Sequence, residues 1–254
     1  MPDRNRAAAI ALQNDVKNCR AERMCPHIVR QLAGSQDADA VAVVAALKSW
    51  DGEYTVDSIC PTVFETFMNF WQRKVLGVHI PERLLDLTQQ QTGLAMSLLE
   101  GAHPSYFAAG TSATAVEAAK QTLAELRSRL GADQKSWQWG VIHKAHWHHP
   151  IANAAFDIGP MSVDGGSHTV RNTGGEQPPH GASSGAEYRI VVDFTVPDSF
   201  LAVQNIGNSG VPGSPHYRDQ FHPWIDGTYH VVHLNRERVE QDSVTTTRLQ
   251  PIGR

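Results

Sequence analysis

Through most of the first half of the chain, apolar residues recur every three or four positions, the period of a helix with one buried face. The clearest helix is predicted over residues 113–130. Its apolar positions are Val116, Ala119, Leu123, Leu126 and Leu130. Thr111 or Ser112 is suited to cap its start, and Gly131 is suited to end it.

Two shorter helices are predicted near the N-terminus. Leu12, Val16 and Cys19 stand at helical spacing and indicate the first of them. Pro26 can occupy the first turn of the second, because a helix has no use for the first backbone N–H, and Gly34 can end it.

The segment after Gly34 predicts a third helix and then a fourth. Asp37 or Asp39 can cap the third, whose apolar positions would be Val41, Val44 and Leu47. Pro61 can open the fourth, which carries a broad apolar stripe typical of helix-packing core. The stripe consists of Val63, Phe64, Phe67, Phe70 and Trp71.

After residue 133 the pattern changes to that of β-strands. Strands are predicted over 137–143, 188–194, 200–203 and 228–234, and alternation of apolar and polar residues is clearest in 188–194. Residues 171–185 are rich in Gly, Pro and Ser, which predicts a long surface loop. Helices followed by strands indicate an α+β fold. We expect a helical region over 1–132 and a β-rich region over 133–254 that completes the same domain.

Composition and charge exclude two classes of partner. The 254 residues carry a net charge of -4, and Lys and Arg are scattered, so no basic stripe for nucleic acid is present. No apolar run has the length of a membrane span, and the N-terminal apolar stretch is too short for an export signal. The three cysteines, Cys19, Cys25 and Cys60, are interpreted as small buried apolar residues, although Cys19 and Cys25 could pair in an exported chain.

A series of motifs in the second half resembles the C-terminal half of the β-chain of penicillin acylases, which are N-terminal-nucleophile hydrolases. The helical first half resembles the same family more weakly, through segments such as Trp50-Asp51-Gly52. The motifs are Trp137–His143, His149-Pro150, Gly165-Gly166, Tyr188–Asp193, Gly207–Gly210, Ser214–Gln220 and Trp224–Tyr229. The resemblance implies that the strands belong to part of a layered αββα fold.

The resemblance also implies an activity, the cleavage of an acyl-amide such as a β-lactam side chain or an N-acyl homoserine lactone. In that family a Ser, Cys or Thr at the β-chain N-terminus is the nucleophile, and its own α-amine is the base. That residue and the oxyanion-binding asparagine lie N-terminal to the region that this chain resembles. Ser35, Ser49 and Ser58 are internal and lack the free amine, and Pro2 offers no side-chain nucleophile.

We therefore assign no catalytic, cofactor or metal residue and expect the chain alone to be inactive. The expected partner is the missing N-terminal acylase portion, or a second copy of the chain through self-association. The different-class alternative is a non-catalytic binding or structural remnant. The family is typically periplasmic, which leaves the location of this chain open.

A cluster of histidines suggests metal binding as a second possible chemistry. His143, His146, His148 and His149 lie within seven residues, and in an extended segment His146 and His148 point to the same side. The spacing matches no established zinc signature, and Asp157 is the nearest acid. Loop and strand-end histidines bonded to backbone carbonyls are the preferred interpretation, and a metal site is the alternative. The later histidines are His168, His180, His216, His222, His230 and His233.

A serine hydrolase triad is the third chemistry considered. Ser209 is followed in sequence by His216 and Asp219. A nucleophile elbow places one residue between the serine and the second glycine, and a helix follows it. Here Gly210 directly follows Ser209 and prolines come next, so a tight turn is the preferred interpretation.

The remaining motif residues are interpreted as structural. We expect Trp137, Trp139 and Trp224 to pack between layers with their N–H groups bonded. Arg189 and Asp193 could pair with groups on neighbouring strands. Gly165-Gly166 and Gly227 are interpreted as turn glycines.

Overall fold

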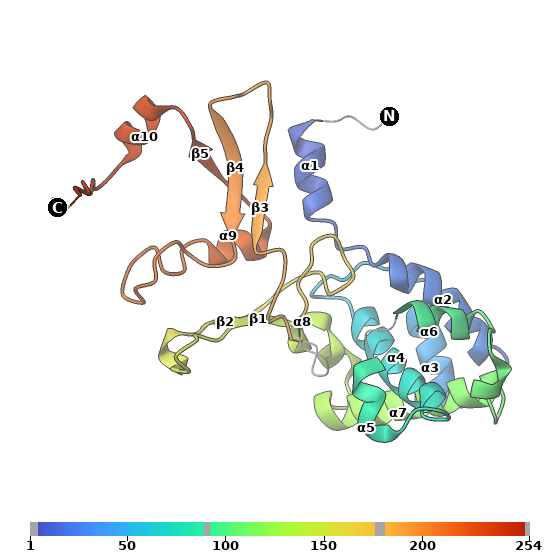
Figure 1. Cartoon of the computed structure of the whole chain (residues 1–254). Helices are drawn as coiled ribbons and strands as arrows, with labels where there is room; N and C mark the ends of the chain where they lie inside the picture. The colour runs from blue at the N-terminus through green and yellow to red at the C-terminus, as the bar shows by residue number, and fades with distance from the viewer. Residues whose placement is uncertain (1–4, 89–91, 176–180, 252–254) are drawn as a thin grey trace. The chain divides into compact units, whose positions relative to one another are not determined.

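The computed structural model describes residues 5–88, 92–175 and 181–251 (Figure 1). The chain divides into two compact units. The helical unit is the continuous segment 15–185, and the sheet unit combines the chain up to Asn14 with the chain from Ala186 onward. The expectation that 1–132 and 133–254 complete one domain stays a prediction.

The helical unit contains most of the helices of the chain. Its α-helices are α2 (Cys19–Leu32), α3 (Ala38–Leu47), α4 (Cys60–Leu76), α5 (Glu82–Leu85), α6 (Thr92–Leu99), α7 (Thr111–Leu130) and α8 (Trp139–Ile142). Its 3-10 helices are η1 (Asp86–Thr88), η2 (Pro104–Tyr106), η3 (Gln134–Trp137) and η4 (Ala154–Phe156). The predicted helices over 113–130 and from Pro61 onward are confirmed, and Gly131 ends α7 as expected. The predicted cap of α7 is wrong, because Thr111 and Ser112 lie inside the helix and Gly110 is its N-cap.

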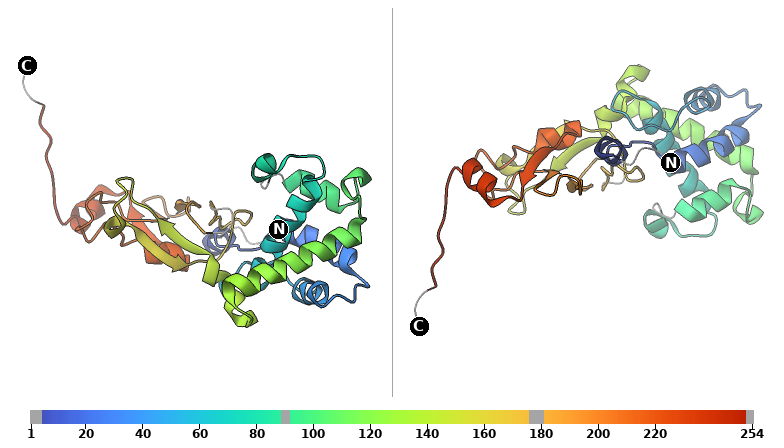
Figure 2. Two further views of the ribbon diagram at one scale, coloured as in Figure 1. Left: turned by 90° about the horizontal axis from the view of Figure 1, so that it is seen from below. Right: turned by 90° about the horizontal axis from the view of Figure 1, so that it is seen from above.

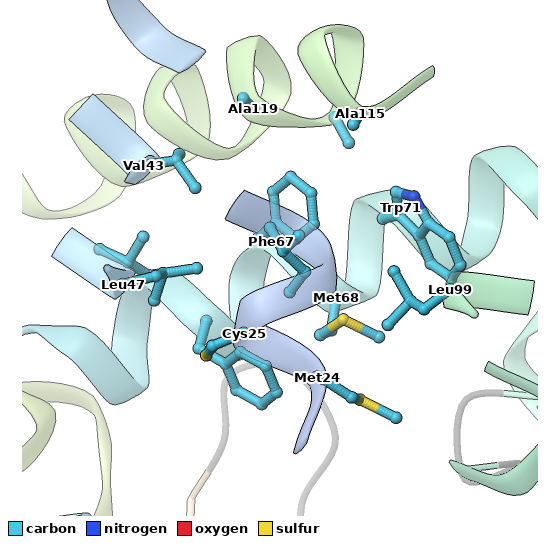
Figure 3. Close-up of a cluster of buried hydrophobic side chains, with 14 of the residues drawn as sticks. Met24, Cys25, Val43, Leu47, Phe67, Met68, Trp71, Leu99, Ala115 and Ala119 are labelled. Carbon is cyan, nitrogen blue, oxygen red and sulfur yellow. The ribbon is translucent and has the colours of Figure 1, made fainter. Parts of the chain in front are cut away.

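The core of the helical unit lies where α4 and α7 pack together, with α2 and α3 beside them (Figure 2). The predicted aromatic stripe of α4 fills it, since Phe64, Phe67 and Trp71 are fully buried. Figure 3 shows Phe67 pointing toward Ala115 and Ala119 of α7, whose small side chains allow close approach of the two helices. The interpretation of this stripe as packing core is confirmed.

Two helix predictions near the N-terminus are wrong. Val16 does not continue a first helix, because the chain leaves helical conformation after Gln13 and resumes it at Cys19, capped by the Asn18 side chain. Pro26 lies inside α2 rather than in its first turn. The cap supplied by Asn18 starts the helix one full turn and more before the proline, which the apolar spacing alone could not reveal.

A hairpin of two strands lies in the helical unit. β1 (Lys144–Trp147) pairs antiparallel with β2 (Ile158–Ser162), with a register shift between Ala145 and Trp147. The predicted strand over 137–143 is wrong, because this segment forms η3 and α8. Trp139 and Gly140 donate their N–H groups to the carbonyls of Ser58 and Val56, which ties the segment to the loop before α4 instead of to a strand.

The sheet unit is built around a three-stranded antiparallel sheet in the order β3-β4-β5. Its strands are β3 (Tyr188–Val191), β4 (Ser199–Gln204) and β5 (His230–His233), and its helices are α1 (Arg6–Gln13), α9 (Phe221–Asp226) and α10 (Arg236–Asp242). The three strands predicted in this region are confirmed, with β3 ending earlier than expected. Asp193 accepts from Thr195 N–H and turns the chain there. Gly227 ends α9 with a φ of 69°, as expected of a turn glycine.

The segments outside these elements follow the predicted pattern. Residues 171–175 and 181–185 form loop with isolated bridges. Figure 2 shows the chain after α10 extending away from the other elements of its unit. Within the described part of the chain, no helix combines the length and the apolar character that crossing a membrane requires.

Candidate functional site

The motif residues of the second half build a buried network in the helical unit. Trp139 donates its indole N–H to Gly165 O at 2.8 Å, and its ring stacks on His143 with centroids 4.5 Å apart. His143 Nε2 lies 3.0 Å from Thr173 Oγ1, which donates to Asp164 O. Gly165 adopts a φ of 92° at the turn. These groups are bonded to one another, so they hold the loop 163–173 in place.

The tryptophan predictions are confirmed. Trp137 donates to Gly131 O at 2.9 Å, and in the sheet unit Trp224 donates to Ala186 O at 2.8 Å. Arg189 Nη1 donates to Trp224 O, and its guanidinium lies 4.7 Å from the Trp224 ring centroid. All three tryptophans and Arg189 are therefore structural.

A buried ionic cluster in the helical unit was not anticipated from the sequence. Arg20 Nη2 of α2 lies 2.7 and 2.6 Å from the two carboxylate oxygens of Glu65 on α4, and Tyr54 donates its hydroxyl to Glu65 at 2.7 Å. Burial and the neighbouring Glu65 charge raise the pKa of Tyr54 well above the usual phenol value. The only signal in the sequence was an acid beside the aromatic stripe of α4.

The β1–β2 hairpin brings together two of the clustered histidines and one acid. His148 Nδ1 lies 2.8 Å from Asp157 Oδ2, and His146 Nε2 lies 3.6 Å from the same oxygen. The His149 N–H donates to Asp157 Oδ1 at 2.9 Å. This backbone bond, followed by the bond from His148, lowers the pKa of Asp157 below its usual range. The expectation that His146 and His148 share one side is confirmed, since their rings lie 4.1 Å apart.

The rings of His149 and His168 have other surroundings. His149 Nδ1 accepts from Ile151 N–H, and its ring packs on Phe156. Burial, followed by the charge of Arg20, lowers the pKa of His168. His180 lies outside the described residues. Among those that are described, only His146, His148 and Asp157 converge as three groups able to hold one metal ion.

The serine triad is not assembled in the sheet unit. His216 Nδ1 lies 2.8 Å from Asp219 Oδ2, so two of its members do meet. Ser209, however, meets His216 through the backbone, its N–H donating to His216 O, and its hydroxyl accepts from Val211 N–H. The preferred interpretation as a tight turn agrees with these bonds.

A groove with an apolar floor runs between α1 and the end of β3 in the sheet unit. Its volume is about 710 Å³. It is lined by Asn5, Arg6, Ala8, Ala9, Leu12 and the segment Val191–Thr195. The apolar side chains of the strand predicted over 188–194 face outward here, because Tyr188, Ile190, Val192 and Phe194 are all exposed.

Comparisons with known proteins agree with the motifs. An acyl-homoserine lactone acylase of Pseudomonas syringae is 34% identical over 122 residues, which are 45% of this chain and 15% of that protein. Penicillin acylase 2 proenzyme of Pseudomonas sp. (strain SE83) is also 34% identical over 122 residues, 44% of this chain and 16% of its own length. The chain thus spans only a small part of these relatives.

A solved structure shares the fold. The thermostable penicillin G acylase of Alcaligenes faecalis superposes with a TM-score of 0.57 and 17% identity, over 94% of this chain and 48% of that one. The α+β fold predicted from the sequence is thereby confirmed. The family model for penicillin amidase matches residues 2–241, so the chain belongs to the penicillin amidase family.

Proposed function

We propose that this chain forms the C-terminal part of an acylase that hydrolyses the amide bond of N-acyl homoserine lactones. The observation that carries the proposal is the family match over residues 2–241, combined with relatives whose names specify this substrate. The β-lactam side chain is the second candidate substrate, because a penicillin acylase is among the relatives at the same 34% identity.

We place the nucleophile of the reaction in the rest of the acylase, N-terminal to the region that this chain resembles. In N-terminal-nucleophile enzymes the α-amine of the first residue deprotonates its side chain. Hydrogen-bond donors then stabilise the oxyanion of the tetrahedral intermediate. We assign both tasks to the rest of the acylase, and to this chain the task of completing the fold.

The surface that would receive the rest of the acylase lies on the sheet unit. Phe194 is 92% exposed, and Val192 and Ile190 beside it are exposed as well. β3 is an outer strand of its sheet, and its Ile190 carbonyl accepts from Gln13 Nε2 at 2.8 Å, so the exposed side chains rather than the strand edge form this surface. A contiguous exposed apolar face of this kind marks a protein interface. A layered sheet-on-sheet arrangement of the family's fold would bury it.

The test is complementation. The chain is co-expressed with the Pseudomonas syringae acylase truncated before the segment that this chain matches, and release of homoserine lactone is measured. Amide cleavage by the pair, with none from either part alone, is expected. If the pair cleaves only penicillins, the substrate assignment is wrong; if it cleaves neither, the acylase proposal fails.

A matched pair of variants tests the receiving surface. Phe194→Asp places a charge on the proposed interface and should abolish both association and complementation. Val244→Asp is the control, because Val244 is just as exposed but lies in the extended segment after α10. Equal loss with both variants would overturn the assignment of the β3 face. If the face instead joins two copies of this chain, only the wild type sediments as a dimer when expressed alone.

A further inference from the structure

We propose that His146, His148 and Asp157 form a binding site for Zn²⁺. Their ligand atoms, one from each side chain, all lie within 4.8 Å of one another. This site is separate from the acylase reaction assigned above and does not depend on it.

The hairpin determines the convergence of the three side chains. His146 lies in β1 and His148 directly follows it, so the alternation of strand side chains puts both on one face. Asp157 stands directly before β2, and Trp147 pairs with Ile158. Strand pairing therefore brings the carboxylate next to the two imidazoles. The register shift between Ala145 and Trp147 changes which part of β2 stands opposite His146 and His148.

Hydrogen bonds from backbone N–H groups help to hold the ligands in place. The N–H of His149 donates to Asp157 Oδ1, which leaves Oδ2 directed at His148 and His146. The backbone N–H of His146 donates to Ala182 O at 3.0 Å, which ties the strand to the following loop. Hydrogen bonds of this kind orient metal-binding side chains and are part of functional metal sites.

The spacing fits a small divalent transition metal. Zinc binds imidazole nitrogen and carboxylate oxygen at about 2.0–2.2 Å, so tetrahedral ligand atoms lie roughly 3.4 Å apart. Asp157 Oδ2 lies 2.8 Å from one nitrogen and 3.6 Å from the other, which brackets that separation. Two imidazoles favour zinc over Ca²⁺ or Mg²⁺, which prefer all-oxygen sites.

Three protein ligands leave at least one coordination position for water or another small ligand. The exposure of His148 makes that position accessible from solvent. The site would therefore exchange its metal readily and accept an additional donor from solvent.

The simpler interpretation is a histidine–aspartate hydrogen bond with no metal. The chain contains a matched example in His216 and Asp219, whose Nδ1 and Oδ2 atoms are also 2.8 Å apart. Among the described residues, His216 and Asp219 belong to no group of three converging ligands. This pair serves as an internal control for the hairpin site.

The experiment is calorimetric titration of the untagged 254-residue chain with Zn²⁺ after treatment with EDTA. It is done in a Cys19→Ser background, because the exposed thiol of Cys19 is an unrelated zinc ligand. We expect one zinc per chain, with an affinity at least about tenfold lower in His148→Gln, His146→Gln and Asp157→Asn. His216→Gln should bind zinc like the parent, and Ca²⁺ should not compete.

A second measurement guards against variants that fail to fold. Thermal melting in EDTA must be the same for the parent and for His148→Gln, whose side chain is exposed. Addition of zinc should then raise the melting temperature of the parent only. Absence of zinc binding to the parent, or binding that His148→Gln and Asp157→Asn leave unchanged, would overturn the proposal.

Discussion

Glu65 of α4 holds the guanidinium of Arg20 of α2 at 2.6 Å, with only 17% and 9% of their side chains exposed. Tyr54, in the loop before α4, donates its hydroxyl to the same carboxylate. Arg20 also lies over the ring of Phe64, 5.2 Å from its centroid. The cluster therefore links α2, α4 and the loop that precedes α4 through one largely buried carboxylate.

We expect Arg20→Ala to lower the free energy of unfolding by about 3 kcal/mol, because it leaves the buried charge of Glu65 without its partner. Arg23→Ala on the same helix is the control. Its ion pair with Glu100 is exposed on both sides, so less than about 1 kcal/mol is expected. Urea denaturation measures both. In the double variant Arg20→Ala/Glu65→Ala the loss should be smaller than the sum of the single losses; strict additivity would show that the two charges do not interact.

The pKa of Tyr54, raised by burial and by the Glu65 charge, predicts a loss of stability at alkaline pH. Below a pH of about 10 the tyrosine is protonated in both folded and unfolded chains. Above it the unfolded chain loses the proton while folded Tyr54 keeps it, so the free energy of unfolding falls by up to about 1.4 kcal/mol per pH unit. Tyr54→Phe should flatten this slope, and Tyr188→Phe, at an exposed tyrosine, should not. Equal slopes in the wild type and in Tyr54→Phe would contradict the assignment of this pH dependence to Tyr54.

Helix α3 shows where hydrophobic spacing predicts an element but not its orientation. Its existence and the cap at Asp37 were predictable, and Asp37 does accept from Asp39 and Ala40 N–H. Nearly every residue of 38–47 is apolar, so no single face stands out. The structure buries Val43 completely and leaves Val41 of the predicted face 52% exposed, while Leu47 of that face is buried as expected and Val44 is partly buried.

The burial of Val43 in place of Val41 can be measured. Val43→Ala should lower the free energy of unfolding by about 2 kcal/mol, since it removes two methyl groups from a packed core. Val41→Ala, the same substitution two residues away, should change it by less than about 0.5 kcal/mol. Denaturant midpoints of the two variants decide which face of α3 is buried, and a larger loss at Val41 would restore the face expected from the sequence.

For the candidate sites too, features that depend on neighbouring residues could be predicted from the sequence, and features that depend on long-range contacts could not. The shared side of His146 and His148 follows from strand alternation and was predictable. The addition of Asp157 depends on the register of β1 against β2, and the union of Arg20 with Glu65 depends on how α2 packs on α4. The sequence showed only that an acid was present in each case, not which groups it would meet. The motifs identified the family because they occur in order, although most of their residues prove to be structural.

The three cysteines differ in environment, and their reactivity should differ accordingly. Cys25 is buried, and burial, followed by the neighbouring Cys60, raises the pKa of its thiol to about 12. Burial also raises the pKa of Cys60, whose thiol lies 3.2 Å from Ala46 O. Cys19 is exposed, contrary to the expectation that all three are buried.

Because the thiolate is the reactive form, iodoacetamide at pH 8 should modify Cys19 alone in the folded chain, and all three in urea. Peptide mass spectrometry after a timed reaction measures this, with Cys19→Ser as the control that should remain unmodified until it unfolds. Rapid modification of Cys25 under native conditions would show that the contact between α2 and α4 opens far more readily than its buried ion pair implies.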